Sequence, residues 1–192
     1  MDQTRIAESM HKHTGVLEAS LQKHGGALSR LARRLTETFH AGGRLVVIGS
    51  GQFGAVADLV ASFFNYRLSL ERPVLPAVSL CRDSMLGLSL GRDDQLQQFF
   101  SRQLQALGGG GDLVLAFSDG ARDEAVEEAF AVARGVGSST AFVFRGREEA
   151  FFGEKPDFLF DIETDSTADA LEVSHFCGRV LCELVEAELF GL

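Results

Sequence analysis

Five short apolar runs, separated by segments with helical periodicity, constrain the fold of this chain more than any other feature. The runs span residues 45–48, 75–80, 113–117, 140–144 and 158–162, and helical patterns span 54–70, 94–107, 122–134 and 168–190. Each run is hydrophobic at almost every position, as the strands of a parallel sheet are when helices cover both of its faces. The alternation predicts an α/β fold, a three-layer α-β-α sandwich around a five-stranded parallel sheet.

A long helical pattern over residues 3–40 precedes the first strand. Gly25 and Gly26 interrupt it, so we expect either two helices or one bent helix. The apolar stripe of this segment must be buried on its own sheet or on a partner subunit, and we favour the partner. We therefore divide the chain into an N-terminal helical oligomerisation segment, residues 1–42, and a sheet domain, residues 43–192. The stripe and its counterpart near the other end of the chain comprise Leu17, Leu21, Leu28, Leu31, Leu35, Val180, Leu181, Leu184 and Leu189.

Composition excludes several classes of function. The 192 residues carry 18 Lys and Arg against 27 Asp and Glu, a formal net charge of −9, which argues against general binding of nucleic acid or of an anionic membrane. No apolar run has the length of a membrane span, and the polar start does not resemble a signal peptide. The three cysteines lack metal-ligand spacing, and their odd count without an export signal indicates reduced thiols in a cytoplasmic protein. His11 and His13 are expected to be a solvated pair on a helix rather than metal ligands.

Two polar loops follow predicted strands whose carboxyl ends should share one edge of the sheet. Their candidate ligand-binding residues are Ser50, Gly51 and Gln52 in the first loop and Ser118, Asp119, Gly120 and Arg122 in the second. Small residues let the backbone approach a ligand, hydroxyl groups donate hydrogen bonds, and a following helix favours negative charge. Either loop alone is typical of a helix cap, but together they predict a site for a phosphorylated ligand. The glycine run 108–111 precedes a strand, so we interpret it as a connection.

Three longer segments resemble one protein family. They are ERPVLPAVSL at 71–80, GRDDQLQQFFSRQLQALGGGGDLVLAFS at 91–118 and LEVSHFCGRVLCELVEAELF at 171–190. Together with the GSG loop, they resemble the sugar-isomerase (SIS) domain family, in the branch of the phosphoheptose isomerases and of a bacterial protein that binds the replication initiator. The resemblance covers nearly the whole chain. It implies the SIS fold, a phosphosugar ligand, and a homotetramer or dimer in which the terminal helices contact neighbouring subunits.

The loops depart from the family pattern. The first loop of the isomerases reads G-N-G-G-S, and Ser50, Gln52 and Phe53 replace its second, fourth and fifth residues here. A substrate-contacting Asn-Asp pair of the family falls on Arg92 and Asp93, so Asp93 is a further candidate. The second loop, S-T-S-G-N-S in the family, is shorter here and gains the carboxylate of Asp119. That carboxylate should repel phosphate unless Arg122 compensates.

The catalytic positions depart further. Aldose–ketose isomerisation needs a general base and a group that polarises the carbonyl. The resemblance places the family's metal-binding and catalytic His, Glu, Gln and His on Leu59, Phe63, Leu171 and Arg179. We therefore predict no catalytic residue, no metal and no cofactor, and we expect Phe53, Leu59 and Phe63 to fill the catalytic wall with hydrocarbon. Glu172 stays a candidate ligand contact, although Glu172 and His175 alone would not close a metal site.

Three functions remain open at this point. We favour a protein that binds a phosphosugar or another carbohydrate derivative without isomerase activity and signals to a protein partner. The second is an active isomerase of sedoheptulose 7-phosphate in which Asp93, Glu172 or His175 supplies the base. The third is an interaction scaffold like the initiator-binding relative.

Overall fold

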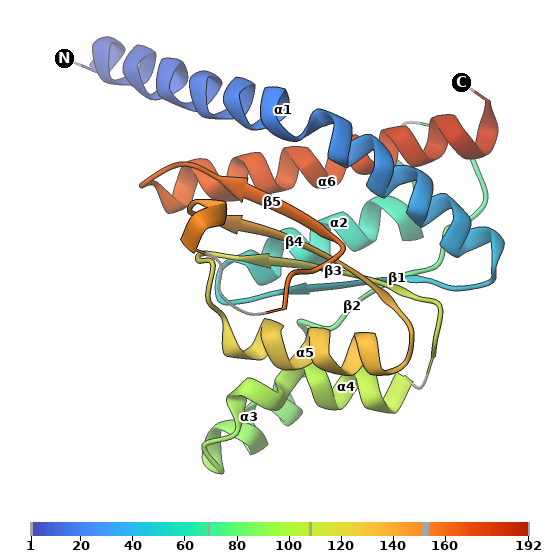
Figure 1. The fold of residues 1–192 in the computed structure, drawn as a ribbon. Helices are drawn as coiled ribbons and strands as arrows, with labels where there is room; N and C mark the ends of the chain where they lie inside the picture. Colours follow the sequence, from blue (N-terminus) through green and yellow to red (C-terminus); the bar gives the residue numbers. More distant parts are fainter. Residues whose placement is uncertain (1, 69, 108, 151–153, 192) are drawn as a thin grey trace.

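A five-stranded parallel sheet between two layers of helices organises the chain (Figure 1). The computed structural model describes residues 2–68, 70–107, 109–150 and 154–191. The strand order is β2-β1-β3-β4-β5, and each neighbouring pair is parallel. The strands are β1 (Leu45–Gly49), β2 (Ala77–Ser79), β3 (Leu113–Ser118), β4 (Ser139–Arg145) and β5 (Phe158–Ile162). The predicted three-layer α/β fold and its five strands are confirmed.

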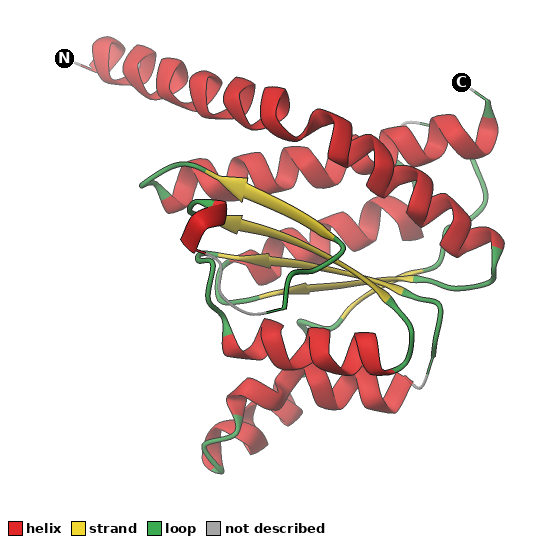
Figure 2. Cartoon of the chain, in the orientation of Figure 1, coloured by secondary structure: helices red, strands yellow, loops and turns green. Residues whose placement is uncertain are grey.

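Helices cover both faces of the sheet (Figure 2). One layer contains α1 (Asp2–His40), α2 (Phe53–Asn65) and α6 (Thr167–Phe190), and the other contains α3 (Ser84–Arg92), α4 (Phe99–Leu107) and α5 (Glu124–Gly135). Two short 3-10 helices are η1 (Leu96–Gln98) and η2 (Glu148–Ala150). The sequence patterns missed α3, because Leu90 is its one buried residue and two glycines weaken its helical pattern. No helix in these described ranges is long and apolar enough to cross a bilayer.

The strands contribute alternate side chains to two separate parts of the core. Leu45 and Val47 pack with residues of α1, α2 and α6, while Val46 and Ile48 pack with residues of α4 and α5. Successive side chains of a strand point to opposite faces of the sheet. Helices therefore cover both faces, which explains why the runs are hydrophobic at almost every position.

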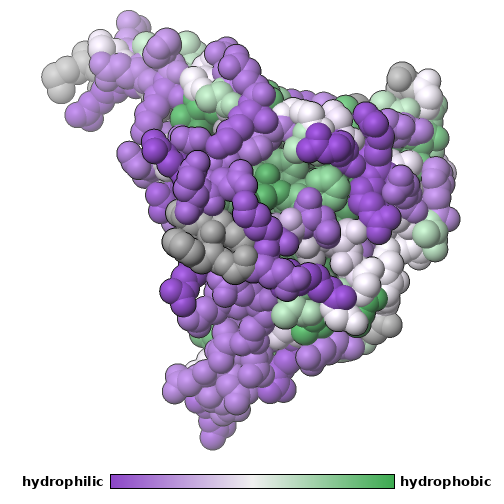
Figure 3. All heavy atoms as spheres, viewed as in Figure 1, coloured by the Kyte–Doolittle hydropathy of each residue, from purple (hydrophilic) through white to green (hydrophobic). Residues whose placement is uncertain are grey.

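The course and the burial of α1 differ from two expectations. It is continuous through Gly25 and Gly26, so the alternative of two helices is wrong. Leu28, Leu31 and Leu35 are buried within their own chain, so the favoured burial on a partner is wrong for the second half of the stripe. The start of α1 projects past the sheet in Figure 1, where Ile6 and Met10 are 67% and 66% exposed. Hydrophilic residues predominate over that projecting part on the face shown in Figure 3.

The glycine-rich connection before β3 is partly outside the described residues. Gly108 lies outside them, and the residues that follow run from the end of α4 toward β3. A Cβ atom on Gly109 would lie 2.8 Å from Nη2 of Arg44, and a Cβ atom on Gly110 would lie 2.5 Å from the carbonyl oxygen of Val136. The described part of the connection is therefore closely packed and does not contribute to the candidate site.

Candidate functional site

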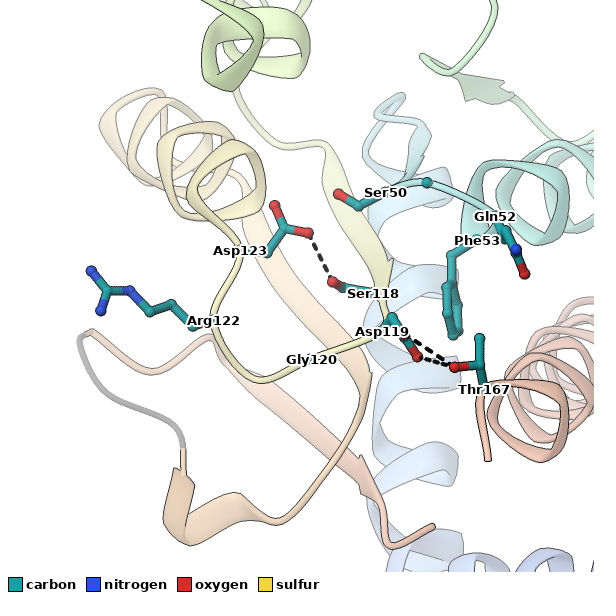
Figure 4. A pocket seen from close by; sticks show the side chains of 10 residues that line it. Ser50, Gln52, Phe53, Ser118, Asp119, Gly120, Arg122, Asp123 and Thr167 are labelled. Atoms are coloured by element: carbon teal, nitrogen blue, oxygen red, sulfur yellow. Dashed lines mark hydrogen bonds between the residues drawn. The ribbon is translucent and has the colours of Figure 1, made fainter. Parts of the chain in front are cut away.

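A pocket of about 550 Å³ lies where the loops after β1 and β3 meet at the carboxyl edge of the sheet (Figure 4). Its lining residues are Ser50, Gly51, Gln52, Phe53, Ser118, Asp119, Gly120, Arg122, Asp123 and Thr167. The structure thus brings together the seven candidates predicted from the two loops. Asp93 and Glu172 are not among the lining residues.

The first loop turns tightly enough to need glycine. A Cβ atom on Gly49 would lie 2.3 Å from the carbonyl oxygen of Phe53, and Gly51 has a φ of +55°. The amide of Phe53 donates to the carbonyl of Ser50 at 3.0 Å, and the amide of Gly54 donates to that of Gly51 at 3.2 Å. The side chain of Gln52, at the N-cap of α2, makes no capping hydrogen bond. The loop therefore presents backbone groups, the hydroxyl of Ser50 and the side chain of Gln52 to the pocket.

The hydrocarbon wall predicted for this site is present only in part. Phe53 is 1% exposed, and in Figure 4 its ring lies beside the Asp119–Thr167 contact. The side chain of Leu59, in contrast, is 43% exposed in the single chain, so the prediction that it fills a wall of the catalytic site is wrong there. Phe63 is half-buried, and its ring centroid lies 5.8 Å from that of His175. Neither Leu59 nor Phe63 lines the pocket.

The second loop neutralises Asp119 through a residue that the sequence patterns missed. Arg145 Nε donates to Asp119 Oδ1 at 2.6 Å, and Thr167 Oγ1 donates to the two carboxylate oxygens at 3.1 and 3.2 Å. The side chain of Arg122 points away from the pocket (Figure 4). Arg122, which the sequence left open as a partner that could compensate Asp119, does not do so; the last residue of β4 does this instead.

Asp123 is the second charged residue that sequence reasoning missed. Its Oδ1 accepts hydrogen bonds from the amides of Ala125 and Val126, at 3.1 and 3.2 Å, and so caps α5. Its Oδ2 accepts from the hydroxyl of Ser118 at 2.8 Å. An aspartate at the start of a helical apolar pattern is a typical N-cap, so the sequence does contain a signal for this role of Asp123.

The remaining two candidates lie elsewhere. Asp93 is exposed at the C-terminal end of α3. Oε2 of Glu172 lies 2.6 Å from Nδ1 of His13, although the two groups are not aligned as a hydrogen bond. The expected solvated histidine pair is thus wrong for His13, which is half-buried and faces α6.

A second cluster joins the two terminal helices. His13, Asp169 and Glu172 each offer one ligand atom, and these atoms lie within 4.8 Å of one another. Three such donors suit a divalent cation of the zinc type. Lys12 Nζ lies 3.4 Å from Asp169 Oδ2, so a cationic group already balances part of this charge.

Comparison with known proteins places the chain in a family, although no family model matches the sequence. The chain is 30% identical over 190 residues to the phosphoheptose isomerase of Trichlorobacter lovleyi. The alignment covers 99% of this chain and 96% of that protein. The chain belongs to the phosphoheptose isomerase family. A second family member, the phosphoheptose isomerase of Nitratidesulfovibrio vulgaris, is 35% identical over 159 residues, 83% of this chain and 76% of its own length.

Solved structures of phosphoheptose isomerases share the fold. That from Neisseria gonorrhoeae gives a TM-score of 0.87 at 19% identity and covers 97% of this chain and 100% of its own. That from Francisella tularensis gives a TM-score of 0.85 at 20% identity, with 96% and 98% covered. The SIS fold expected from the resemblance is confirmed over nearly the whole chain.

Within this phosphoheptose isomerase family member, the four positions assigned to family chemistry carry unsuitable side chains. Leu59 is exposed, and Phe63 and Leu171 are half-buried. Arg179 forms an ion pair with Glu183 one helical turn away. Three of these side chains are hydrocarbon and the fourth is a permanent cation, so none can accept a proton or bind a metal.

Proposed function

We propose that this member of the phosphoheptose isomerase family binds a sugar or sugar derivative in the pocket between the β1 and β3 loops and does not isomerise it. One observation carries the proposal: the pocket is lined by hydrogen-bonding groups but by none of the side chains that isomerisation requires. Its ten lining residues include no histidine, cysteine, glutamate or lysine. The two carboxylates that line it, Asp119 and Asp123, are already bonded to neighbouring groups of the chain.

The dimensions and chemistry of the pocket support a sugar as its ligand. Its volume of about 550 Å³ is in the range of small-molecule sites. Hydroxyl groups of Ser50 and Thr167, the amide of Gln52 and two carboxylates supply donors and acceptors for a polyol. Support also comes from the relatives, which are named for an enzyme of phosphorylated heptoses.

An active isomerase is the second candidate, and the names of relatives aligned over nearly the full chain favour it. Its base would have to be Asp93, Glu172 or His175. None of the three lines the pocket, and Oε2 of Glu172 lies 2.6 Å from Nδ1 of His13. If this candidate holds, turnover of sedoheptulose 7-phosphate will disappear in Glu172→Gln or His175→Asn.

Calorimetric titration with a panel of aldoses, ketoses and their phosphates tests the proposed function. We expect saturable binding of at least one sugar, and its loss in Ser50→Leu, which adds hydrocarbon to the pocket. The matched control is Ser89→Leu, an equivalent change at an exposed position of α3. Binding that Ser50→Leu and Ser89→Leu affect equally, or no binding by the unmodified protein, would contradict the proposal.

A further inference from the structure

The N-terminus of α5 is where an anion would bind in this pocket, and the chain itself occupies that position. Unpaired amides and the helix dipole make such a terminus an anion site. Here the amides of Ala125 and Val126 donate to Asp123, and the hydroxyl of Ser118 donates to the same carboxylate. Three donors at the start of α5 are therefore already bonded to an internal anion.

The remaining charges in the pocket oppose phosphate as well. The charged residues that line it are Asp119, Asp123 and Arg122, and the Arg122 side chain points away. Arg145 is engaged by Asp119 at 2.6 Å. A phosphate dianion entering the pocket would approach the carboxylate of Asp123 and that of Asp119, which Arg145 already balances, so Asp123 is the main source of repulsion.

We infer that Asp123 substitutes for the phosphate of a ligand, so that the pocket selects the unphosphorylated form of its sugar. This inference rests on the proposed function. The same groups suit a neutral polyol, because sugar hydroxyls donate to carboxylates and accept from the hydroxyl of Ser50 and the amide of Gln52. The carboxylate oxygens that repel phosphate can accept hydrogen bonds from the hydroxyl groups of a sugar.

Inorganic phosphate is the probe that tests the occupied anion site. The unmodified protein should show no saturable binding at millimolar phosphate, followed by calorimetry or by ³¹P resonance. Asp123→Asn removes the charge, and asparagine caps a helix as well as aspartate does. We expect this variant to bind phosphate at least about tenfold more tightly, since one like charge is gone and the Ser118 hydroxyl can reorient.

Asp83→Asn is the matched control, because Asp83 caps α3 by accepting from the amide of Leu86 and does not line the pocket. It should leave phosphate binding unchanged. Equal phosphate affinity in the unmodified protein and Asp123→Asn would overturn the inference. A gain shared by Asp83→Asn would overturn it too, since the effect would then be one of net charge.

The sugar panel separates this inference from the proposed function. Tighter binding of a sugar than of its own phosphate ester supports both. Tighter binding of the ester overturns the inference and leaves the proposed function standing. If no sugar binds in either form while Asp123→Asn gains phosphate, the proposed function fails and the assignment of Asp123 to the anion position holds.

Discussion

Gly178 is the residue on which the contact between α6 and α2 depends most directly. A Cβ atom there would lie 2.2 Å from Cγ2 of Val60, a buried and β-branched side chain that has little freedom to move. Gly178→Ala should therefore lower the free energy of unfolding by about 1–3 kcal/mol, measured by denaturant titration. Gly15→Ala in α1 is the control, because nothing lies within 4 Å of its Cβ position. It should raise the free energy of unfolding by about 0.5–1 kcal/mol, as alanine does in a helix. Destabilisation of similar size in both variants would contradict this account of the packing.

For individual residues of the loops, the sequence predicted which ones lie close together but not which charged groups form ion pairs. Ser50 and Ser118 were predictable because each lies within two residues of the end of an apolar run, and parallel strands bring such positions together. Arg145 stands at the end of β4, about 26 residues from Asp119 in the sequence, and no local pattern links the two. The same limit applies to Arg122: its position in the loop was predictable, but the direction of its side chain depends on the completed fold.

At the level of helices and strands, the contact between α1 and β5 shows most clearly how a helix layer is attached to the sheet. Asp161 on β5 is buried and accepts from Lys23 Nζ at 2.7 Å, while its Oδ1 lies 2.7 Å from Nε2 of His24. Burial by itself raises the pKa of Asp161, but the hydrogen bonds from Lys23 and from the amide of Glu148 lower the pKa below its ordinary value of 3.8. The ionised carboxylate therefore stabilises the folded chain.

Asp161→Asn should lower the free energy of unfolding by about 1–3 kcal/mol near neutral pH, since it removes the charge from these hydrogen bonds. Because the folded-state pKa is depressed, this stabilisation is fully present above the unfolded pKa, about 4, and is lost as the pH falls through the lower folded value. The difference between the two proteins should shrink on acidification in urea titrations. Glu163→Gln, at an exposed partner of Lys23, should cost less than about 1 kcal/mol. A difference for Asp161→Asn that stays constant down to strongly acid pH would contradict the assignment.

The elements themselves were largely predictable, and the failures have physical causes. Strands were found because helices cover both faces of the sheet, and α2, α4, α5 and α6 were found from apolar periodicity. The helix α3 was missed because it buries one side chain. The surface that covers the apolar stripe of α1 could not be predicted. An apolar helix face indicates that it is buried, but it does not indicate which element or subunit buries it. In the structure, α1 packs against α6 of its own chain.

For the whole molecule, we still predict a homo-oligomer, now through the projecting start of α1. Ile6 and Met10 are exposed there, whereas most of the stripe is covered by the chain itself. Light scattering should give a multiple of the 20.8 kDa chain mass. Met10→Glu should lower that mass without unfolding the protein, because it places a charge in the contact. Met85→Glu, at a comparably exposed site on α3, should not. A monomer at micromolar concentration would contradict this prediction.

The purified protein should also hold no stoichiometric zinc, because hydrocarbon and arginine occupy the positions that the family resemblance assigns to metal binding. Elemental analysis after gel filtration checks this. Zinc at about one equivalent per chain would contradict the prediction for the unmodified protein. His13→Ala would then show whether the cluster with Asp169 and Glu172 holds the ion.

Turnover of sedoheptulose 7-phosphate tests most directly whether this family member binds sugar without isomerising it. Aldose phosphate formation should be followed with and without added zinc, with the Trichlorobacter lovleyi relative as the active control. We predict product at the level of the protein-free reaction, because the described residues that line the pocket include no histidine, cysteine, glutamate or lysine, and its two carboxylates are bonded to neighbouring groups. Product that rises in proportion to the amount of this protein, and that Ser50→Leu reduces but Ser89→Leu does not, would contradict the claim.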